Sequence, residues 1–394
     1  QERAHRITVS GAIVDHACTL LAGLRSGFSF ERIAALAPEI VPTPKVLAAV
    51  LKTAGLVDAQ SFPHPENARR FLEEPRSEAL SRLGRAWLSS DTFNDLRMIP
   101  HLEAEGGWQN QPEPARQKVL SMLNEVPPEK WWHLPSFIDA VNRHHPDFQR
   151  PAGDYDSWYI KDARTGAYLR GFHHWQDVEG ELIRWMVTAP LHWFSAVDLA
   201  APAAGSPAAA FRLTSLFELL LSGRAFPEVP PEESELHIDS KGQLALPSGF
   251  PRDARYQIAR FCDWEPPRKG AYRYRLTPAA LERARAQELT VKQLIALLRK
   301  HSAAKIPPNI LSALKRWDSH GAQARLEQVV ILRLSAPAIL KALQSSRVAR
   351  FLGDPIGPAA VLVKPGAQQN VLDALAELGY LGQADLASGE PIGD

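Results

Sequence analysis

Short apolar runs separated by proline, glycine and charged residues recur along the whole sequence. In the first part of the chain, helical spacing of the apolar positions predicts helices at 13–24, 30–36, 44–55 and 78–90, with Gly55 ending the third. A short strand is predicted at 56–62, before the last of these helices. We interpret this order as a winged-helix-like unit over residues 1–95.

A related order follows in residues 96–226, which are rich in tryptophan. Helices are predicted at 115–126, 134–143 and 179–189, and an alanine, proline and glycine linker at 201–209 leads to a strand end and a helix at 211–223. An Arg-Leu pair stands before a cap and a short helix at 82, 212 and 275, which favours tandem winged-helix-like units. The alternative is that a strand, a Ser or Thr cap and a helix form a common sequence in any α/β protein.

A Pro- and Glu-rich segment at 227–235 predicts a linker, and the next region spans 236–325. A hairpin is predicted at 236–247 around Gly242, followed by a short helix at 254–265 with Trp264 on its apolar side. Thr277 is expected to cap a helix that has Pro278 at its first position. Thr290 and Gln293 form a capping-box pattern, and Asn309 is expected to start a further helix that ends near Gly321.

Residues 326–394 alternate between predicted strands and helices. Two continuous apolar runs, 328–334 and 359–365, predict buried strands, and each precedes a helical pattern that starts near Pro337 or Ala367. This order predicts a small α/β lobe. The fold class expected for the chain is therefore mostly helical α+β, with tandem winged-helix-like units followed by that lobe.

Charge is unevenly distributed along the chain. Residues 265–350 contain seventeen Lys and Arg against five Asp and Glu, a net charge of +12, whereas the whole chain is only +1. A basic segment on a body of opposite sign indicates a surface for nucleic acid or for an acidic partner.

The candidate nucleic-acid contacts all lie in this segment. Arg and Lys would contact phosphates, and alternation along the YRYR strand would place its two Arg on one face and its two Tyr on the other. Helix C-termini favour Lys and Arg through the helix dipole, so a solvated surface or an acidic protein partner stays an alternative. The predicted phosphate contacts are Arg273, Arg275, Arg299, Lys300, Lys305, Lys315, Arg316 and Arg325, and the candidates for base stacking are Tyr272, Tyr274 and Trp317.

Other chemistry has weaker support. Cys18 and Cys262 are the only cysteines, which favours free buried thiols in a reducing, cytoplasmic compartment and excludes a Cys₄ metal site. The adjacent pairs His144-His145 and His173-His174 point apart and predict no metal site. The aspartates at 154, 156, 162 and 177 could hold Mg²⁺ in a nuclease, but Asp162 to Gly166 has the pattern of a turn. Six tryptophans between 131 and 193 predict a domain core, with a peptide-binding groove as the alternative.

Residues 236–381 resemble the helicase-associated region at the N-terminus of XPB-type DNA helicases. The resemblance rests on the hairpin HIDSKGQLALP, the helix ARYQIARFCDWE and the stretch YRYRLTPAALERARAQELTVKQLIALLRKHS, together with the spacing to VVILRL and LAELGYL. In that family the region lies beside an ATPase motor and includes a lobe associated with DNA engagement and damage sensing. Bacterial proteins have it in front of a motor or as a stand-alone chain.

The sequence departs from a full helicase because it contains no Gly-Lys dipeptide and hence no P-loop. We therefore expect a non-enzymatic, helicase-associated module that binds DNA without a cofactor. The alternative is a protein–protein adaptor that docks on a helicase or on another partner. The first residue is Gln, as in a sequence trimmed at its start, and we find no secretory signal and no membrane span, so no membrane partner is expected. Oligomeric state and the preferred DNA form are not predicted.

Overall fold

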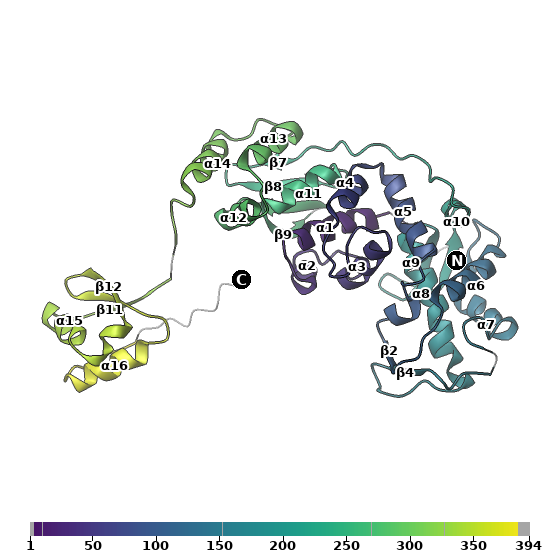
Figure 1. Ribbon diagram of the computed structural model, residues 1–394, viewed down its shortest axis with the longest axis horizontal. Helices are drawn as coiled ribbons and strands as arrows, with labels where there is room; N and C mark the ends of the chain where they lie inside the picture. Colours follow the sequence, from purple (N-terminus) through teal and green to yellow (C-terminus); the bar gives the residue numbers. More distant parts are fainter. Residues whose placement is uncertain (1–3, 10, 152, 269, 327, 385–394) are drawn as a thin grey trace. The chain divides into compact units, whose positions relative to one another are not determined.

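The computed structural model describes residues 4–9, 11–151, 153–268, 270–326 and 328–384, and these ranges form many short helices with small antiparallel sheets (Figure 1). The predicted class, mostly helical α+β, is confirmed. The chain divides into two compact units, residues 1–321 and 322–394, and each has its own hydrophobic core. None of the helices within the described ranges combines the length and apolar character needed to cross a membrane.

The chain begins with a short strand and a group of helices. The bounds are β1 (His5–Ile7), α1 (Ile13–Arg25), α2 (Phe30–Leu36), α3 (Pro44–Thr53), α4 (Pro65–Glu73) and α5 (Arg76–Leu88). The strand expected at 56–62 is reduced to one bridge between Val57 and Pro63. The Arg-Leu pair at 82 was also wrongly interpreted, because it lies inside α5, where helical hydrogen bonding continues through both residues.

Two sheets organise the next part of the first unit. The larger has the strand order β1-β5-β6-β3, and the smaller pairs β2 with β4. Thr214 caps α10 directly after β6, as the sequence predicts. The bounds are η1 (Asp95–Met98), β2 (Leu102–Glu105), α6 (Pro112–Asn124), β3 (Trp132–His133), α7 (Leu134–His144), β4 (Tyr159–Asp162), η2 (Phe172–His174), η3 (Gln176–Gly180), α8 (Glu181–Thr188), α9 (Pro190–Trp193), β5 (Val197–Ala201), β6 (Ala210–Leu213) and α10 (Ser215–Leu221).

A third sheet, with the order β7-β8-β10-β9, completes the first unit. The hairpin at Gly242 and the caps at Thr277 and Thr290 are confirmed. Trp264 does not belong to the preceding helix, because that helix ends at Arg260 and Trp264 lies on β9, where it packs edge-on against Phe28. The bounds are β7 (His237–Ile238), β8 (Gln243–Pro247), α11 (Arg252–Arg260), β9 (Asp263–Arg268), β10 (Ala271–Arg275), α12 (Pro278–Ala286), α13 (Val291–His301) and α14 (Pro308–His320).

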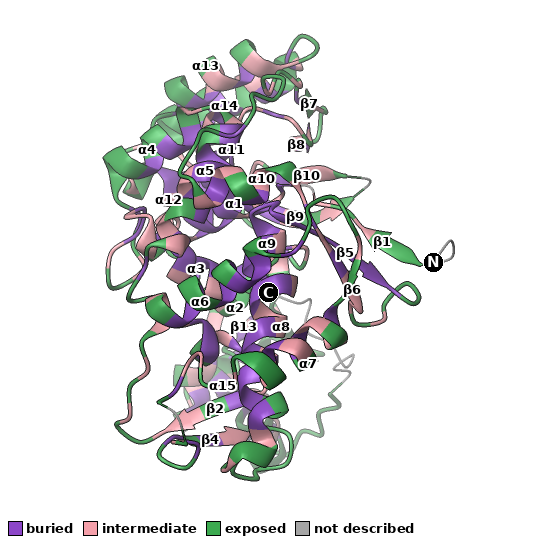
Figure 2. Ribbon diagram, turned by 90° about the vertical axis from the view of Figure 1, so that its right-hand side faces the viewer, coloured by how far each residue is buried: buried purple, intermediate pink, exposed green. Residues whose placement is uncertain are grey.

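Helix α11 packs against α1, so the region after 236 shares one core with the first helices of the chain. Both helices are buried over most of their length, which Figure 2 shows in purple. The predicted linker 227–235 has no helix or strand, but it is not free of the body, since Glu232 pairs with Arg76 and Arg252.

The second unit is a small sheet with helices. Its bounds are β11 (Val330–Arg333), α15 (Pro337–Gln344), η4 (Arg347–Phe351), β12 (Leu352–Gly357), β13 (Ala360–Val363) and α16 (Gln368–Glu377), and the antiparallel strand order is β11-β13-β12. The two apolar runs are strands, as the sequence predicts. The expectation that both are buried strands is wrong for β11. In β11, Val330 and Leu332 pack against the core while Ile331 is 40% exposed. The reason is that an antiparallel sheet can leave one face in water.

Candidate nucleic-acid interface

The antiparallel pair β9 and β10 positions the two arginines of the YRYR strand. Arg273 Nε lies 3.4 Å from Glu265 Oε2, and Arg275 Nη2 lies 2.6 Å from Glu265 Oε1. Arg273 also donates a hydrogen bond to Gln243 on β8. One carboxylate on the neighbouring strand therefore already pairs with both predicted phosphate contacts.

The tyrosines of the same strand face the core. Tyr274 is 4% exposed, and burial raises the pKa of its hydroxyl. The ring centre of Tyr272 lies 3.9 Å from the buried guanidinium of Arg255, and burial raises the pKa of Tyr272 to about 12. Both rings pack protein atoms, so a nucleic-acid base would reach them only after a rearrangement.

Trp317, the third stacking candidate, is also largely covered. It lies on α14, is 8% exposed, and has the guanidinium of Arg285 4.2 Å from its ring centre. This contact joins the end of α12 to α14, and it leaves little free ring surface for stacking.

Helices α13 and α14 and the turn between them present a different set of cations. The apolar faces of the helices are buried through Leu294, Leu298 and Leu314, which turns the charged positions toward solvent. We call this set the α13–α14 cations: Arg299, Lys300, Lys305, Lys315 and Arg316. Each of them is exposed, and none forms an ion pair with a residue in the described part of the chain.

The helix dipole explains only part of this set. Arg299 and Lys300 lie in the last turn of α13, where positive charge is favoured. Lys315 and Arg316 lie before the last turn of α14, which continues to His320. Since the dipole effect falls off within that turn, it does not account for them.

Arg325, the remaining predicted contact, belongs to the second unit. It is exposed and lies between Gly321, where the first unit ends, and β11. It is therefore separated from the α13–α14 cations by the boundary between the units.

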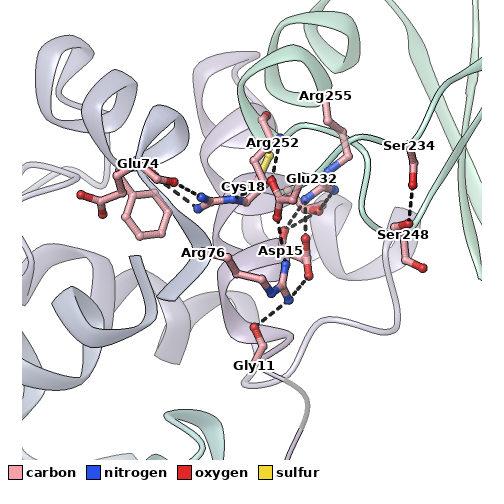
Figure 3. A network of polar contacts seen from close by, with 12 residues as sticks. Gly11, Asp15, Cys18, Glu74, Arg76, Glu232, Ser234, Ser248, Arg252 and Arg255 are labelled. Atoms are coloured by element: carbon pink, nitrogen blue, oxygen red, sulfur yellow. Dashed lines mark hydrogen bonds and ion pairs between the residues drawn. The ribbon is translucent and has the colours of Figure 1, made fainter. Parts of the chain in front are cut away.

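Sequence reasoning missed a group of buried charges that join distant segments (Figure 3). Arg252 and Arg255 on α11 are 2% and 1% exposed. Arg255 donates to Thr19 Oγ1 and to the carbonyl oxygen of Asp15 on α1, at 2.8 and 2.7 Å. Arg252 donates to the carbonyl oxygens of Phe71 and Glu74, and pairs with Glu232 at 3.1 Å. The only signal in the sequence was two arginines three residues apart on an otherwise amphipathic helix.

Asp15 is the carboxylate at the centre of this network. Burial acts to raise its pKa, but the hydrogen bond from Arg76 and the charges of Arg255 and Arg76 outweigh burial, so the pKa lies below its ordinary value. The neighbouring thiol of Cys18 is buried, which raises its pKa to about 11. The network therefore links α1 to α11, and the Cys18 thiol beside it stays protonated at neutral pH.

The aspartates considered as Mg²⁺ ligands of a nuclease do not form a common site in the described ranges. Asp162 pairs with Arg164 in the turn after β4, and that hydrogen bond lowers its pKa. Asp154 accepts from Ser157, and Asp177 pairs with His174. Across the described ranges, no group of three or more His, Cys, Asp or Glu is arranged to hold a metal ion.

Three of the six clustered tryptophans lie in the core, which the sequence favoured for the group. Trp158, Trp175 and Trp193 are at most 9% exposed. Trp132 differs, since 37% of its surface is exposed.

Comparison with known proteins identifies one related region. Residues 236–354 match the family described as helicase conserved C-terminal domain. The chain is also 32% identical over 155 residues to the DNA 3'-5' helicase XPB of Kineococcus radiotolerans, a match that covers 38% of this chain and 28% of the relative. The matched region contains β10 and the α13–α14 cations, and it relates this part of the chain to helicases.

Proposed function

We propose that this chain is a DNA-binding, helicase-associated module that contacts phosphates through the α13–α14 cations. The observation that supports the proposal most is that these five exposed side chains have no carboxylate partner in the described ranges and lie inside the helicase-related region. DNA is the nucleic acid we favour, because the similar protein is named a DNA helicase.

Phosphate contacts of this kind supply affinity rather than sequence preference. Each neutralised phosphate releases counterions, so binding weakens as salt rises. By contrast, Arg273 and Arg275 would first have to exchange Glu265 for a phosphate. We therefore expect the α13–α14 cations to contribute more to DNA affinity than Arg273 and Arg275 of the YRYR strand.

We further propose that the first unit contains winged-helix-like modules and that the chain acts as a non-enzymatic accessory. The strand order β3-β6-β5 around α7 and α8 supports one such module, and β8-β10-β9 around α11 supports another. The absence of a P-loop from the printed sequence is consistent with ATP hydrolysis residing elsewhere.

The second candidate function is an adaptor that docks on a helicase or another protein. The edge strand β11 favours it, because Val329 beside it and Ile331 on it are 46% and 40% exposed. An exposed apolar edge can add a partner's strand.

Fluorescence anisotropy with single-stranded, duplex and forked DNA across a salt series tests the proposal. We expect binding that weakens steeply as salt rises. If none of the three DNA forms binds at low salt, DNA binding is rejected and the adaptor function takes its place.

A further inference from the structure

An open pocket lies between the end of α13 and the start of α14. It has a volume of about 480 Å³, and Arg299 and Lys305 line it together with Ser302, Ile306, Leu311 and two alanines. The volume falls in the range of about 300–1,000 Å³ that is usual for small-ligand sites. Two of the five α13–α14 cations therefore share one concave site.

The lining of the pocket suits an anion. Arg299 and Lys305 are exposed and have no ion-pair partner in the described chain, and none of the residues that line the pocket is acidic. The hydroxyl oxygen of Ser302 is buried beneath this lining and finds no hydrogen-bond partner among the described residues. The remaining wall is apolar, formed by Ile306, Leu311 and the two alanines.

The backbone around the pocket is fixed by an isolated bridge between Leu236, just before β7, and Ser302. Leu236 donates to the carbonyl oxygen of His301, and Ala303 donates to that of Leu236, so the turn after α13 is paired on both sides of Ser302. Ile306 is 6% exposed and anchors the start of α14. A pocket held in this way loses little conformational freedom when a ligand binds.

We propose that this pocket binds a phosphate group. Arg offers paired N–H donors that match phosphate oxygens, and Lys adds a point charge. That the phosphate belongs to a nucleic-acid backbone rests on the proposed function. Free phosphate has the same chemistry, and the experiment separates the two sources.

The first arm compares two double variants that remove equal charge from the basic segment. Arg299→Ala with Lys305→Ala changes the pocket, whereas Arg268→Ala with Lys292→Ala removes two exposed cations that have no ion pair within the described ranges and do not line it. Anisotropy with single-stranded DNA is measured for both across a salt series. We expect the pocket variant to lose about tenfold more affinity than its matched control, because clustered contacts to one phosphate are lost.

The second arm uses inorganic phosphate alone. Thermal unfolding of wild type and of the pocket variant is followed in phosphate and in chloride at matched ionic strength. A bound ligand raises the unfolding temperature, so we expect phosphate to stabilise wild type more than the pocket variant.

If the two double variants lose the same DNA affinity, and phosphate stabilises wild type and the pocket variant equally, the proposed phosphate site is rejected. DNA binding by diffuse charge would still stand. If wild type binds no DNA but phosphate stabilises it in a pocket-dependent way, the pocket stands, its source is free phosphate and the proposed function fails. If neither ligand acts on wild type, both proposals fail.

Discussion

Arg275 on β10 pairs with Glu265 on β9, with Nη2 2.6 Å from Oε1. The same carboxylate also pairs with Arg273. Glu265 thus competes with any phosphate for both arginines of the YRYR strand.

Removing this carboxylate should strengthen DNA binding. In Glu265→Gln the two arginines lose their counter-charge, so we expect an affinity gain of about three- to tenfold at low salt that fades as salt screens the contacts. Anisotropy measures the gain. Glu218→Gln is the control, because Glu218 is exposed and lies outside the basic segment. An unchanged affinity in Glu265→Gln would show that the YRYR arginines do not contact DNA.

Reversing charge on α14 should weaken binding strongly. Lys315→Glu with Arg316→Glu replaces two cations by two anions, and we expect a loss of about 100-fold at low salt and a salt slope shallower by about 2. The matched control is Lys45→Glu with Lys52→Glu, since both lysines are exposed on α3, outside the basic segment. Similar losses in the two double variants would reveal a general charge effect without a defined face.

The contact between α1 and α11 should contribute measurably to stability. Arg255→Met removes the donors to Thr19 and to the Asp15 carbonyl, and we expect the free energy of unfolding to fall by about 2–4 kcal/mol. Urea unfolding followed by tryptophan fluorescence measures the change. Arg69→Met serves as control, because its pair with Glu73 is exposed to solvent and should contribute little to stability. A loss below about 1 kcal/mol for Arg255→Met would contradict the role given to this network.

Asp15 should make stability depend on pH in the acid range. Its pKa in the fold lies below the ordinary value of 3.8, so its contribution is fully present above that value and is lost as pH falls through the lower, folded value. In Asp15→Asn this contribution is absent at every pH. The difference in free energy of unfolding between wild type and Asp15→Asn should therefore stay constant at neutral pH and shrink in acid. A difference that grows in acid would mean that the pKa is raised.

The segment 227–235 should be held in place by Glu232. Its carboxylate lies 3.1 Å from nitrogen atoms of both Arg76 and Arg252. In Glu232→Gln we expect faster cleavage by thermolysin near Val229, which is 47% exposed. Glu233→Gln is the control, because Glu233 is exposed and has no ion pair within the described ranges. Equal cleavage rates in the two variants would show that Glu232 does not restrain the segment.

Local elements of the fold could be predicted because the interactions that form them are local. Thr290 and Gln293 satisfy the first backbone donors of α13 from three residues apart, and Gly242 takes the positive φ that its turn requires. The fold class followed from such elements in order, whereas the relation to helicases rested on a resemblance of residues 236–381 to a known family. The strand pattern at 328–334 predicted a strand but not its exposed face, because one-sided burial depends on which strands and helices become neighbours.

The sequence by itself determined where helices and turns form and that positive charge is concentrated between 265 and 350. Only the tertiary structure decided which of those charges are available to a ligand. Glu265 neutralises Arg273 and Arg275 across a strand pair, whereas Lys315 and Arg316 meet no carboxylate in the described ranges. Likewise, Arg255 reaches Thr19 across 236 residues of sequence. Pairing of this kind is set by how distant segments pack, and a residue's own neighbours along the chain do not specify it.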